Sequence, residues 1–218
     1  MSDDAHVEDL EDADDWIVKT GRDKLEQGRQ QIQRAEAMVT QAGPTPEAEA
    51  DARAAFDVLR SAMNWLEDED SALFEDAHQA LDAAGAFTRR TFGCWLHQEG
   101  TSYEQRCPVA LAHNRVGMSL AAIIEKSECT VCHLAPEDCS HIAGRVYDGV
   151  FCARLITEGR LLEISFVGRP AQPDARIERI SVPVADLQQA LGPRWVPRMD
   201  VSCDRCLSPC PGVSRPWG

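Results

Sequence analysis

The chain has 218 residues, of which 44% are apolar and only 6% aromatic, and it carries a formal net charge of −14. This length suits one moderate domain or two small ones, and the sparse aromatic residues favour helices built on Ala and Leu over an all-β sandwich. No run approaches the roughly 18 consecutive apolar residues that a membrane-spanning helix needs, so the sequence predicts no such helix.

The negative charge is concentrated in the first part of the chain. Residues 1–90 hold 22 acids and 9 bases, a balance of −13, whereas residues 91–218 hold 14 acids and 13 bases, a balance of −1. An acidic surface repels the phosphate backbone, which argues against nucleic-acid binding by the first part. That part is expected to serve as a solvated helical face, as a surface for a basic partner, or as a nucleic-acid mimic.

The chain begins with an acidic stretch that has little apolar content. Eight acids fall between residues 2 and 15, which predicts an acidic disordered leader over residues 1–13. This start lacks the basic and then apolar layout of a signal peptide. We therefore expect a cytoplasmic protein, in which thiols stay reduced and cysteine-rich spacing favours metal over disulfides.

Residues 14–92 are predicted to form an acidic helical arm, either a helical hairpin or three helices, because apolar residues recur at three- and four-residue spacing. The residues expected to begin or end these helices are Asp14 and Asp15, Gly43-Pro44, Thr45-Pro46, Ser71 and Gly93. Thr45 is expected to cap the second helix, with Pro46 in its first turn, and Ser71 to cap the third. His78, on the third helix, is expected at the surface.

Residues 93–218 are predicted to form a zinc-stabilised, β-rich domain. A finger over 94–113 and a knuckle over 129–141 follow the spacings C-x2-H-x9-C-x5-H and C-x2-C-x6-C-x-H. The two ligand sets are Cys94, His97, Cys107 and His113, and then Cys129, Cys132, Cys139 and His141. Each short gap lets one turn offer two side chains to an ion, and the second pair completes a tetrahedron. Four protein ligands leave no open position, so the zinc is expected to be structural.

A C-terminal cysteine cluster over residues 203–210 offers three more ligands. Cys203, Cys206 and Cys210 lack an obvious fourth partner. Cys152 could complete this set or could replace Cys139 in the knuckle, and His133 is a reserve ligand. The sequence therefore predicts two or three structural zinc ions, on which the folding of this half depends.

Strands are expected after the knuckle. Apolar runs at Val150–Ile156, Leu161–Val167 and Ile177–Val182 predict a β meander over residues 146–183. Thr157-Glu-Gly-Arg160 is expected to form the hairpin turn between the first two runs. The predicted fold class is accordingly α+β, with the helical arm followed by the small β-rich domain.

One stretch is similar to a known family. Leu161-Leu-Glu-Ile-Ser-Phe-Val-Gly-Arg-Pro-Ala-Gln-Pro resembles the closing strand and loop of phage prohead maturation proteases, and Gly117-Met-Ser119 is similar to an earlier motif of that family. The resemblance covers about residues 115–182. It implies a small β-rich protease-like fold, with Ser119 in the position of the nucleophile, and a phage, prophage or phage-defence setting.

Two departures from that family favour a protein without its activity. Ala121 stands where the family has a second glycine, and the nearby histidines, His97 and His113, are better employed as metal ligands. A serine needs a base within hydrogen-bond reach to become nucleophilic. The predicted function is therefore a non-enzymatic zinc-binding adaptor that binds another protein through the acidic helical arm, and a homo-oligomer is compatible with the sequence.

Two alternative functions stay open. One is a serine endopeptidase that uses Ser119. The other is a nucleic-acid-binding zinc-finger protein, with a basic patch formed by Arg106, Arg115, Arg145, Arg154, Arg160 and Arg169. The shortage of lysine and of interleaved aromatic residues makes nucleic acid the weaker of the two.

Overall fold

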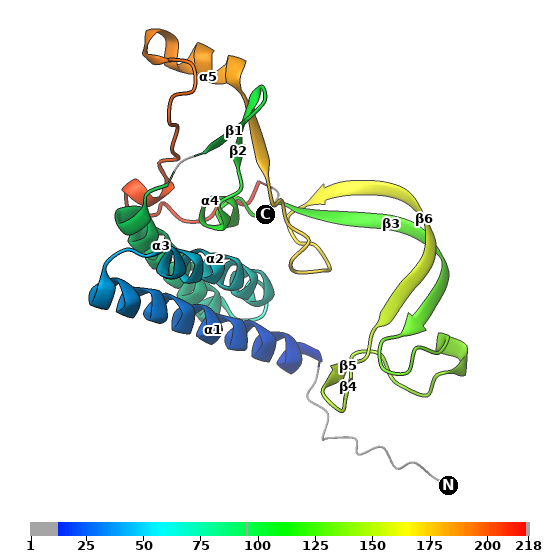
Figure 1. The fold of residues 1–218 in the computed structure, drawn as a ribbon. Helices are drawn as coiled ribbons and strands as arrows, with labels where there is room; N and C mark the ends of the chain where they lie inside the picture. Colours follow the sequence, from blue (N-terminus) through cyan, green and yellow to red (C-terminus); the bar gives the residue numbers. More distant parts are fainter. Residues whose placement is uncertain (1–12, 95, 217–218) are drawn as a thin grey trace.

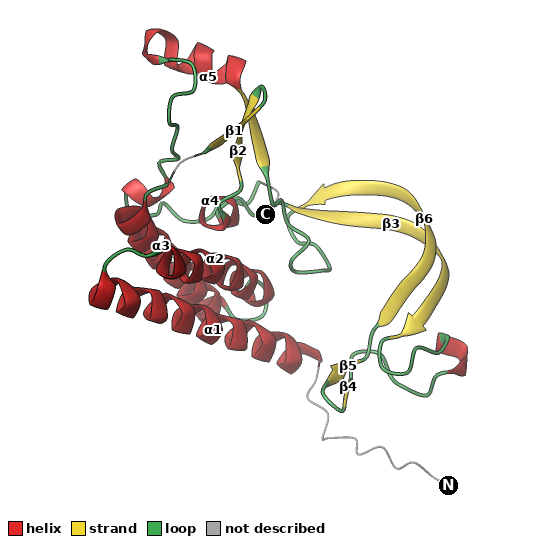
Figure 2. Ribbon diagram, viewed as in Figure 1, coloured by secondary structure: helices red, strands yellow, loops and turns green. Residues whose placement is uncertain are grey.

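A computed structural model describes residues 13–94 and 96–216, so the predicted leader lies almost wholly outside the described residues. The predicted α+β class is confirmed: helices make up the first part of the chain, and strands predominate in the second (Figure 2). None of the described helices is long and apolar enough to cross a lipid bilayer.

Three helices form a bundle at the start of the chain (Figure 1). They are α1 (Ala13–Ala42), α2 (Pro46–Leu66) and α3 (Ser71–Phe92). The predicted cap of α2 is confirmed, since the Thr45 hydroxyl accepts a hydrogen bond from the Ala48 amide at 3.2 Å. The predicted cap of α3 is wrong by one residue: the Asp70 carboxylate, rather than Ser71, accepts from the Ala72 and Leu73 amides.

The bundle core depends on close contact between α1 and α2. Gly21 and Gly28 lie two helical turns apart on α1, and a Cβ atom at either position would come within 2.6 Å of Leu66 or Leu59, respectively. Leu59 and Leu66 are almost fully buried. Glycine at these two positions therefore lets the leucines of α2 lie against the backbone of α1.

The same core takes in residues from the second half of the chain. Val109 and Ala112 of α4 (Pro108–Ala112) belong to the buried cluster of the bundle, and Cys206 and Val213 pack against it. The predicted boundary near residue 93 therefore crosses one shared core, because α4 and the C-terminal segment bury their apolar side chains on α2 and α3.

The strands form three small antiparallel sheets. The first sheet contains β1 (His97–Glu99), β2 (Ser102–Gln105) and β7 (Ile180–Pro183); the second contains β3 (Gly117–Cys129) and β6 (Arg154–Val167); the third contains β4 (Val146–Tyr147) and β5 (Val150–Phe151). The remaining elements are α5 (Val184–Leu191) and the short 3-10 helices η1 (Pro136–Asp138), η2 (Gly192–Arg194) and η3 (Arg205–Leu207).

The predicted β meander over residues 146–183 is wrong. Residues 157–160 form no turn but continue β6, which pairs with β3 along its length, while β7 pairs with β2. Gly159 lies opposite Ile124, and a Cβ atom there would lie 2.9 Å from the Ile123 carbonyl oxygen. The glycine therefore permits the close approach of two irregularly paired strands. In the sequence alone, a glycine with this role looks the same as a glycine in a hairpin turn.

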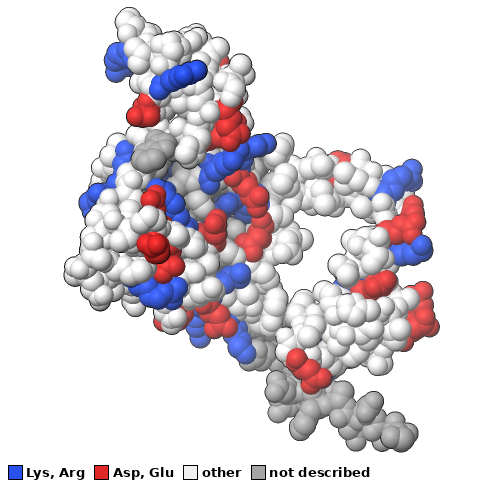
Figure 3. All heavy atoms as spheres, viewed as in Figure 1, with Lys and Arg blue, Asp and Glu red and all other residues white. Residues whose placement is uncertain are grey.

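The β3–β6 ribbon arches away from the bundle and carries the predicted knuckle at its far end (Figure 1). That end returns to α1, where Phe151 contacts Trp16. Figure 3 shows an opening through the molecule between the ribbon and the bundle. The ribbon is thus held at both ends.

The base of the ribbon is fastened to the end of α2 by buried charge. The Glu67 carboxylate, 2% exposed, forms ion pairs of 2.6 Å with both Arg115 and Arg176. Asp174, in the loop after β6, accepts hydrogen bonds from Asn64 and Trp65 of α2 at 2.9 and 2.8 Å. These contacts fix where the ribbon leaves the bundle.

Candidate metal centres

The predicted knuckle assembles at the end of the ribbon. Cys129 ends β3, the next three ligands follow on the loop around η1, and the four side chains form a group that could hold a metal ion: Cys129, Cys132, Cys139 and His141. Their ligand atoms all lie within 4.8 Å of one another. The four ligands that the spacing predicts for the knuckle therefore lie together in the structure.

The distances within this group fit a tetrahedral ion. The Sγ atoms of Cys132 and Cys139 are 3.5 Å apart, and His141 Nδ1 lies 3.4 Å from Cys139 Sγ and 3.8 Å from Cys129 Sγ. Ordinary zinc bond lengths give tetrahedral edges of about 3.8 Å between two sulfurs and about 3.5 Å between sulfur and nitrogen. The side chains are therefore placed for coordination.

Backbone amides prepare one of these thiols as a ligand. Burial raises the pKa of the Cys129 thiol, but hydrogen bonds to its sulfur from the Cys132 and Val131 amides and from neighbouring thiols outweigh burial, and the pKa falls to about 6. The Val131 amide lies 3.4 Å from the Cys129 sulfur. A metal binds the thiolate form, so these amides favour coordination.

Cys152 lies beside the knuckle group, not in the C-terminal cluster. Its Sγ is 3.7 Å from that of Cys129, and the residue is 3% exposed. Burial raises its pKa to about 11, whereas Cys139 keeps its place within the group. Of the two roles predicted for Cys152, completion of the C-terminal set does not fit this position, and Cys152 lies beside the knuckle as a further candidate ligand next to Cys129. His133 is exposed and outside the group.

A second group lies between α3, α4 and the C-terminal segment. His78, Asp82, His113 and Cys210 have ligand atoms that all lie within 4.8 Å of one another and could hold a metal ion. The two Nε2 atoms of the histidines are 3.1 Å apart, and Cys210 Sγ lies 3.3 and 3.1 Å from them. Asp82 completes the group at 3.0 Å from His113 Nε2 and 3.4 Å from His78 Nε2.

The outer contacts of this group orient both imidazoles. His113 Nδ1 lies 2.5 Å from the Val109 carbonyl oxygen, and His78 Nδ1 lies 3.3 Å from a Glu75 carboxylate oxygen. Each acceptor favours the proton on Nδ1 and leaves Nε2 free to bind an ion, as is usual for metal-binding histidines. These two Nδ1 contacts therefore explain why both Nε2 atoms point into the group.

Burial and hydrogen bonding act in opposite directions on the acid of this group. Burial raises the pKa of the Asp82 carboxyl, but hydrogen bonds from His113 and Cys210 outweigh it and hold the pKa below its ordinary value. The carboxylate is thus kept in the charged form that coordinates a cation.

Two of these four residues, His78 and Asp82, are not among the ligands predicted from the sequence. His78, expected at the surface, is 5% exposed, and Asp82 was not considered. Their spacing of four residues places both on one face of α3, which was the signal available in the sequence. It became informative only once α4 and the C-terminal segment supplied His113 and Cys210.

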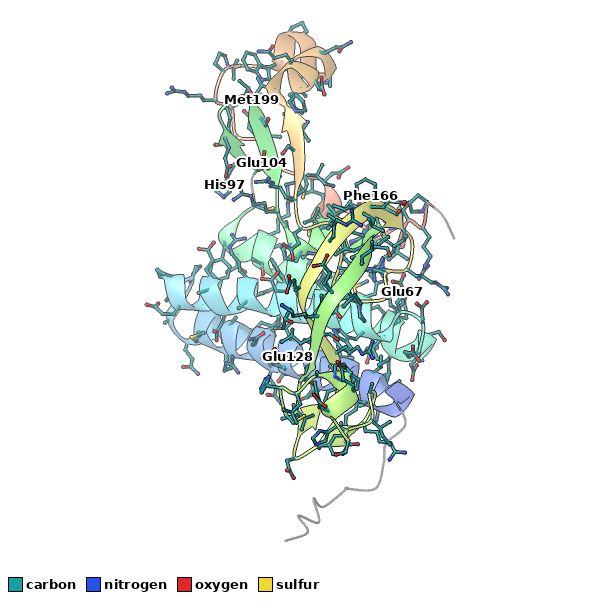
Figure 4. The ribbon with its side chains drawn as sticks, turned by 90° about the vertical axis from the view of Figure 1, so that its right-hand side faces the viewer. Glu67, His97, Glu104, Glu128, Phe166 and Met199 are labelled. Atoms are coloured by element: carbon teal, nitrogen blue, oxygen red, sulfur yellow. The ribbon has the colours of Figure 1, made fainter. Side chains whose placement is uncertain are left out.

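The predicted finger of Cys94, His97, Cys107 and His113 does not assemble. His97 lies on β1 opposite Glu104, with an exposed side chain (Figure 4), whereas His113 joins His78 in the second group. The β1–β2 hairpin separates them because strand pairing, rather than metal, fixes the position of His97. Cys94 and Cys107 lie instead near Cys203, with which both interact electrostatically.

The predicted nucleophile stands in the ribbon. Ser119 lies opposite Ser165 in the pairing of β3 with β6. Across residues 13–94 and 96–216, no hydrogen bond joins the Ser119 hydroxyl to a histidine, and His113 is buried in the second metal group. The endopeptidase reading stays a prediction from the motif.

Three of the six arginines of the predicted basic patch are ion-paired. Arg106 pairs with Glu99 at 2.7 Å and Arg169 with Asp68 at 3.0 Å. Arg115 is only 1% exposed, because it neutralises Glu67. Arg115 is therefore unavailable to a nucleic acid.

Comparison of the chain with protein-family models, with curated proteins and with solved structures gave no match. The resemblance to prohead maturation proteases accordingly stays a prediction drawn from the sequence motifs.

Proposed function

We propose that this protein is a non-enzymatic, zinc-stabilised adaptor that binds another protein through the β3–β6 ribbon. The observation that carries the proposal is a set of ten large apolar side chains on the ribbon, each 40–67% exposed. They are Met118, Leu120, Ile123, Ile124, Leu155, Ile156, Leu161, Leu162, Ile164 and Phe166. Exposed apolar surface of this extent marks interaction sites.

The apolar side chains are ordered on the ribbon. Met118 of β3 lies directly opposite Phe166 of β6, and Leu120 of β3 lies opposite Ile164 of β6. These four side chains therefore form one patch on one face of the ribbon. Among the described residues, the ribbon strands pair with each other, and the one further bridge joins Gly117 to Arg176 at the base of β3, so beyond that bridge the outer edge of each strand is unpaired. A partner can therefore add a strand to an edge and place apolar side chains on the patch.

A groove lies where the ribbon leaves the bundle. It has a volume of about 800 Å³ and is lined by Met118, Phe166, Arg106 and residues 174–179. A groove that has both apolar and charged walls is suited to hold one side chain by which a partner is anchored. The groove extends the ribbon patch onto the body of the protein.

The occupant that we favour is a different protein and not a second copy. Two copies would each carry a net charge of −14, most of it on the helical part of the chain, and this charge opposes their association. The ribbon is fixed at its base by Glu67 and at its tip by the contact with α1. A surface that is already ordered loses less entropy when a partner binds. The acidic helices are the other candidate surface.

Zinc is the metal that we propose for both groups. Tetrahedral sets of four ligands drawn from thiolate, imidazole and carboxylate groups are typical of zinc. At the knuckle, three thiolates and one imidazole supply four ligands, which suits a structural role. In this reading the ion maintains the far end of the ribbon and thereby the binding surface.

The test is site-specific photo-cross-linking in the cells that produce the protein. A photoreactive residue replaces Leu120, and a matched control replaces the exposed Ala37 of α1. We expect Leu120 to cross-link to one defined heterologous protein. That protein, once purified, should bind the wild-type chain, and Ile164→Lys should weaken the binding at least tenfold.

Each other outcome overturns the proposal in a specific way. Cross-linking from Ala37 alone would assign the partner to the acidic helices. A cross-link between two copies, with a dimer by light scattering, would make the second copy the occupant. No cross-link from either position, for a monomeric chain, would remove the adaptor function.

A further inference from the structure

Five cysteines belong to neither metal group, and the fold brings four of them, all but Cys152, to one place. They are Cys94, after α3; Cys107, before α4; and Cys203 and Cys206, around the start of η3. All four are partly buried and unpaired by disulfides. Their spacing in the sequence predicts two different sites, one for Cys94 and Cys107 and another for Cys203 and Cys206.

Backbone pairing places Cys94 beside Cys203. Leu96 and Val201 form an antiparallel bridge, in which the Leu96 amide donates to the Val201 carbonyl at 2.5 Å. Cys94 and Cys203 each lie two residues from this bridge along their own segments, so the bridge brings the two segments together close to both cysteines. The Cys203 thiol raises the pKa of the neighbouring Cys94 thiol, and the Arg89 guanidinium donates a hydrogen bond to the Cys203 carbonyl oxygen at 2.7 Å.

The other two cysteines are held at the surface of α3. A Cβ atom on Gly85 would lie 2.9 Å from both Cys206 Sγ and Val109 Cγ1. Cys206 thus rests on bare helix backbone next to Val109, two residues after Cys107. Gln105 orients the segment that carries Cys107, because its side-chain oxygen accepts a hydrogen bond from the Cys107 amide at 2.9 Å.

We propose that Cys94, Cys107, Cys203 and Cys206 bind a third ion, an all-thiolate structural zinc that fastens the C-terminal segment to α3 and α4. Cys203 and Cys206 have the two-residue spacing of a zinc knuckle. Cys107 and Cys206 both pack against the buried core of the bundle, and Arg89 holds the Cys203 carbonyl oxygen, so the C-terminal pair is already held on α3.

The proposed third site and the second group would both attach the same C-terminal segment to α3. Cys206 and Cys210 lie four residues apart on the same segment, and they meet α3 at Gly85 and Asp82, respectively. Within the described residues, only the first two groups have all their ligand atoms within 4.8 Å of one another. The third ion is therefore expected to draw its four sulfurs inward as it binds.

Native mass spectrometry of the full chain, purified under reducing conditions without added metal, tests the proposal. We expect three zinc ions in the wild-type protein and two in Cys206→Ser. Ser208→Ala is the control, since Ser208 is an exposed residue on the same segment as Cys206, and it should keep three ions. Cys206→His, which preserves a ligand, should also keep three.

Alkylation of the wild-type protein tests the third zinc site even if Cys206→Ser does not fold. We expect iodoacetamide to leave the four cysteines unmodified until a chelator is added. Two ions with all four cysteines readily alkylated, or a Cys94–Cys203 disulfide in the native protein, would overturn the third site. Neither outcome affects the ribbon or the first two groups, so failure here is distinct from failure of the adaptor proposal.

Discussion

The indole ring of Trp16 on α1 stacks on the phenyl ring of Phe151 on β5, with ring centroids 4.1 Å apart and planes inclined by 15°. Trp16 also meets Trp65 of α2 edge-on at 5.2 Å. One side chain therefore joins the helical bundle to the knuckle at the far end of the ribbon. This contact closes the arch.

Replacing Trp16 should release the knuckle end. We expect Trp16→Ala to increase hydrogen exchange over residues 146–153 while exchange in α2 changes little. A stacked aromatic pair contributes about 0.5–1.5 kcal/mol beyond the area that it buries. A double-mutant cycle with Phe151→Ala, measured by urea unfolding, should recover a coupling free energy in that range. Simple additivity of the two substitutions would contradict the contact.

Removal of metal should unfold the knuckle before the bundle. Between residues 129 and 152, Cys129 and Cys152 are the only apolar side chains in the buried core, so little besides an ion holds this segment together. We expect a chelator to abolish hydrogen-exchange protection there while α1 and α2 keep theirs. His141→Ala should reproduce the effect without chelator, and His133→Asn, outside the group, should not. Unchanged protection after complete metal removal would contradict a structural ion.

Loss of the Glu67 charge should strongly destabilise the protein. In Glu67→Gln the guanidinium groups of Arg115 and Arg176 stay buried without their carboxylate, and breaking a buried pair in this way costs about 3–5 kcal/mol. The matched control is Asp68→Asn, which removes a partner of Arg169, whose side chain is 72% exposed. An exposed pair contributes at most about 1 kcal/mol. Equal losses in the free energy of unfolding would show that Glu67 is not buried as described.

The same carboxylate predicts a dependence of stability on pH. Burial raises the pKa of Glu67, but hydrogen bonding and charge from Arg115, with Arg176 and Arg215, outweigh burial and hold it below the ordinary value of 4.5. The folded pKa is thus lower than the unfolded one. The contribution is fully present above pH 4.5 and is lost as the pH falls through the folded pKa. Unfolding free energies measured across this range should fall less steeply in Glu67→Gln than in the wild type.

Packing should override helix propensity at Gly28. Alanine is better than glycine inside a helix by about 1 kcal/mol, yet a Cβ atom here would lie 2.6 Å from Leu59. Overpacking a close contact costs about 1–3 kcal/mol. We therefore expect Gly28→Ala to lower the melting temperature, whereas Gln27→Ala, on the exposed side of α1, should leave it nearly unchanged. A higher melting temperature for Gly28→Ala would contradict the close approach of α1 and α2.

The features that the sequence predicted correctly depend on residues close together in the chain. Thr45 and Pro46 begin α2 because a cap and its helix are adjacent, and Gly93 ends α3 with a φ angle of 81° that suits glycine. The knuckle was predictable because its four ligands lie between Cys129 and His141. Short segments determine such features by local geometry.

The features that the sequence left undecided depend on residues far apart. His78 and Cys210 are separated by 132 positions, and their thiol and imidazole meet only because α4 and the C-terminal segment pack on α3. The same is true of His97, which strand pairing holds away from the other ligands. By itself, the sequence determined the helices, the α+β class and the knuckle. The tertiary structure alone decided how the remaining ligands are grouped, because burial of a shared apolar core, not spacing along the chain, sets which distant side chains lie together.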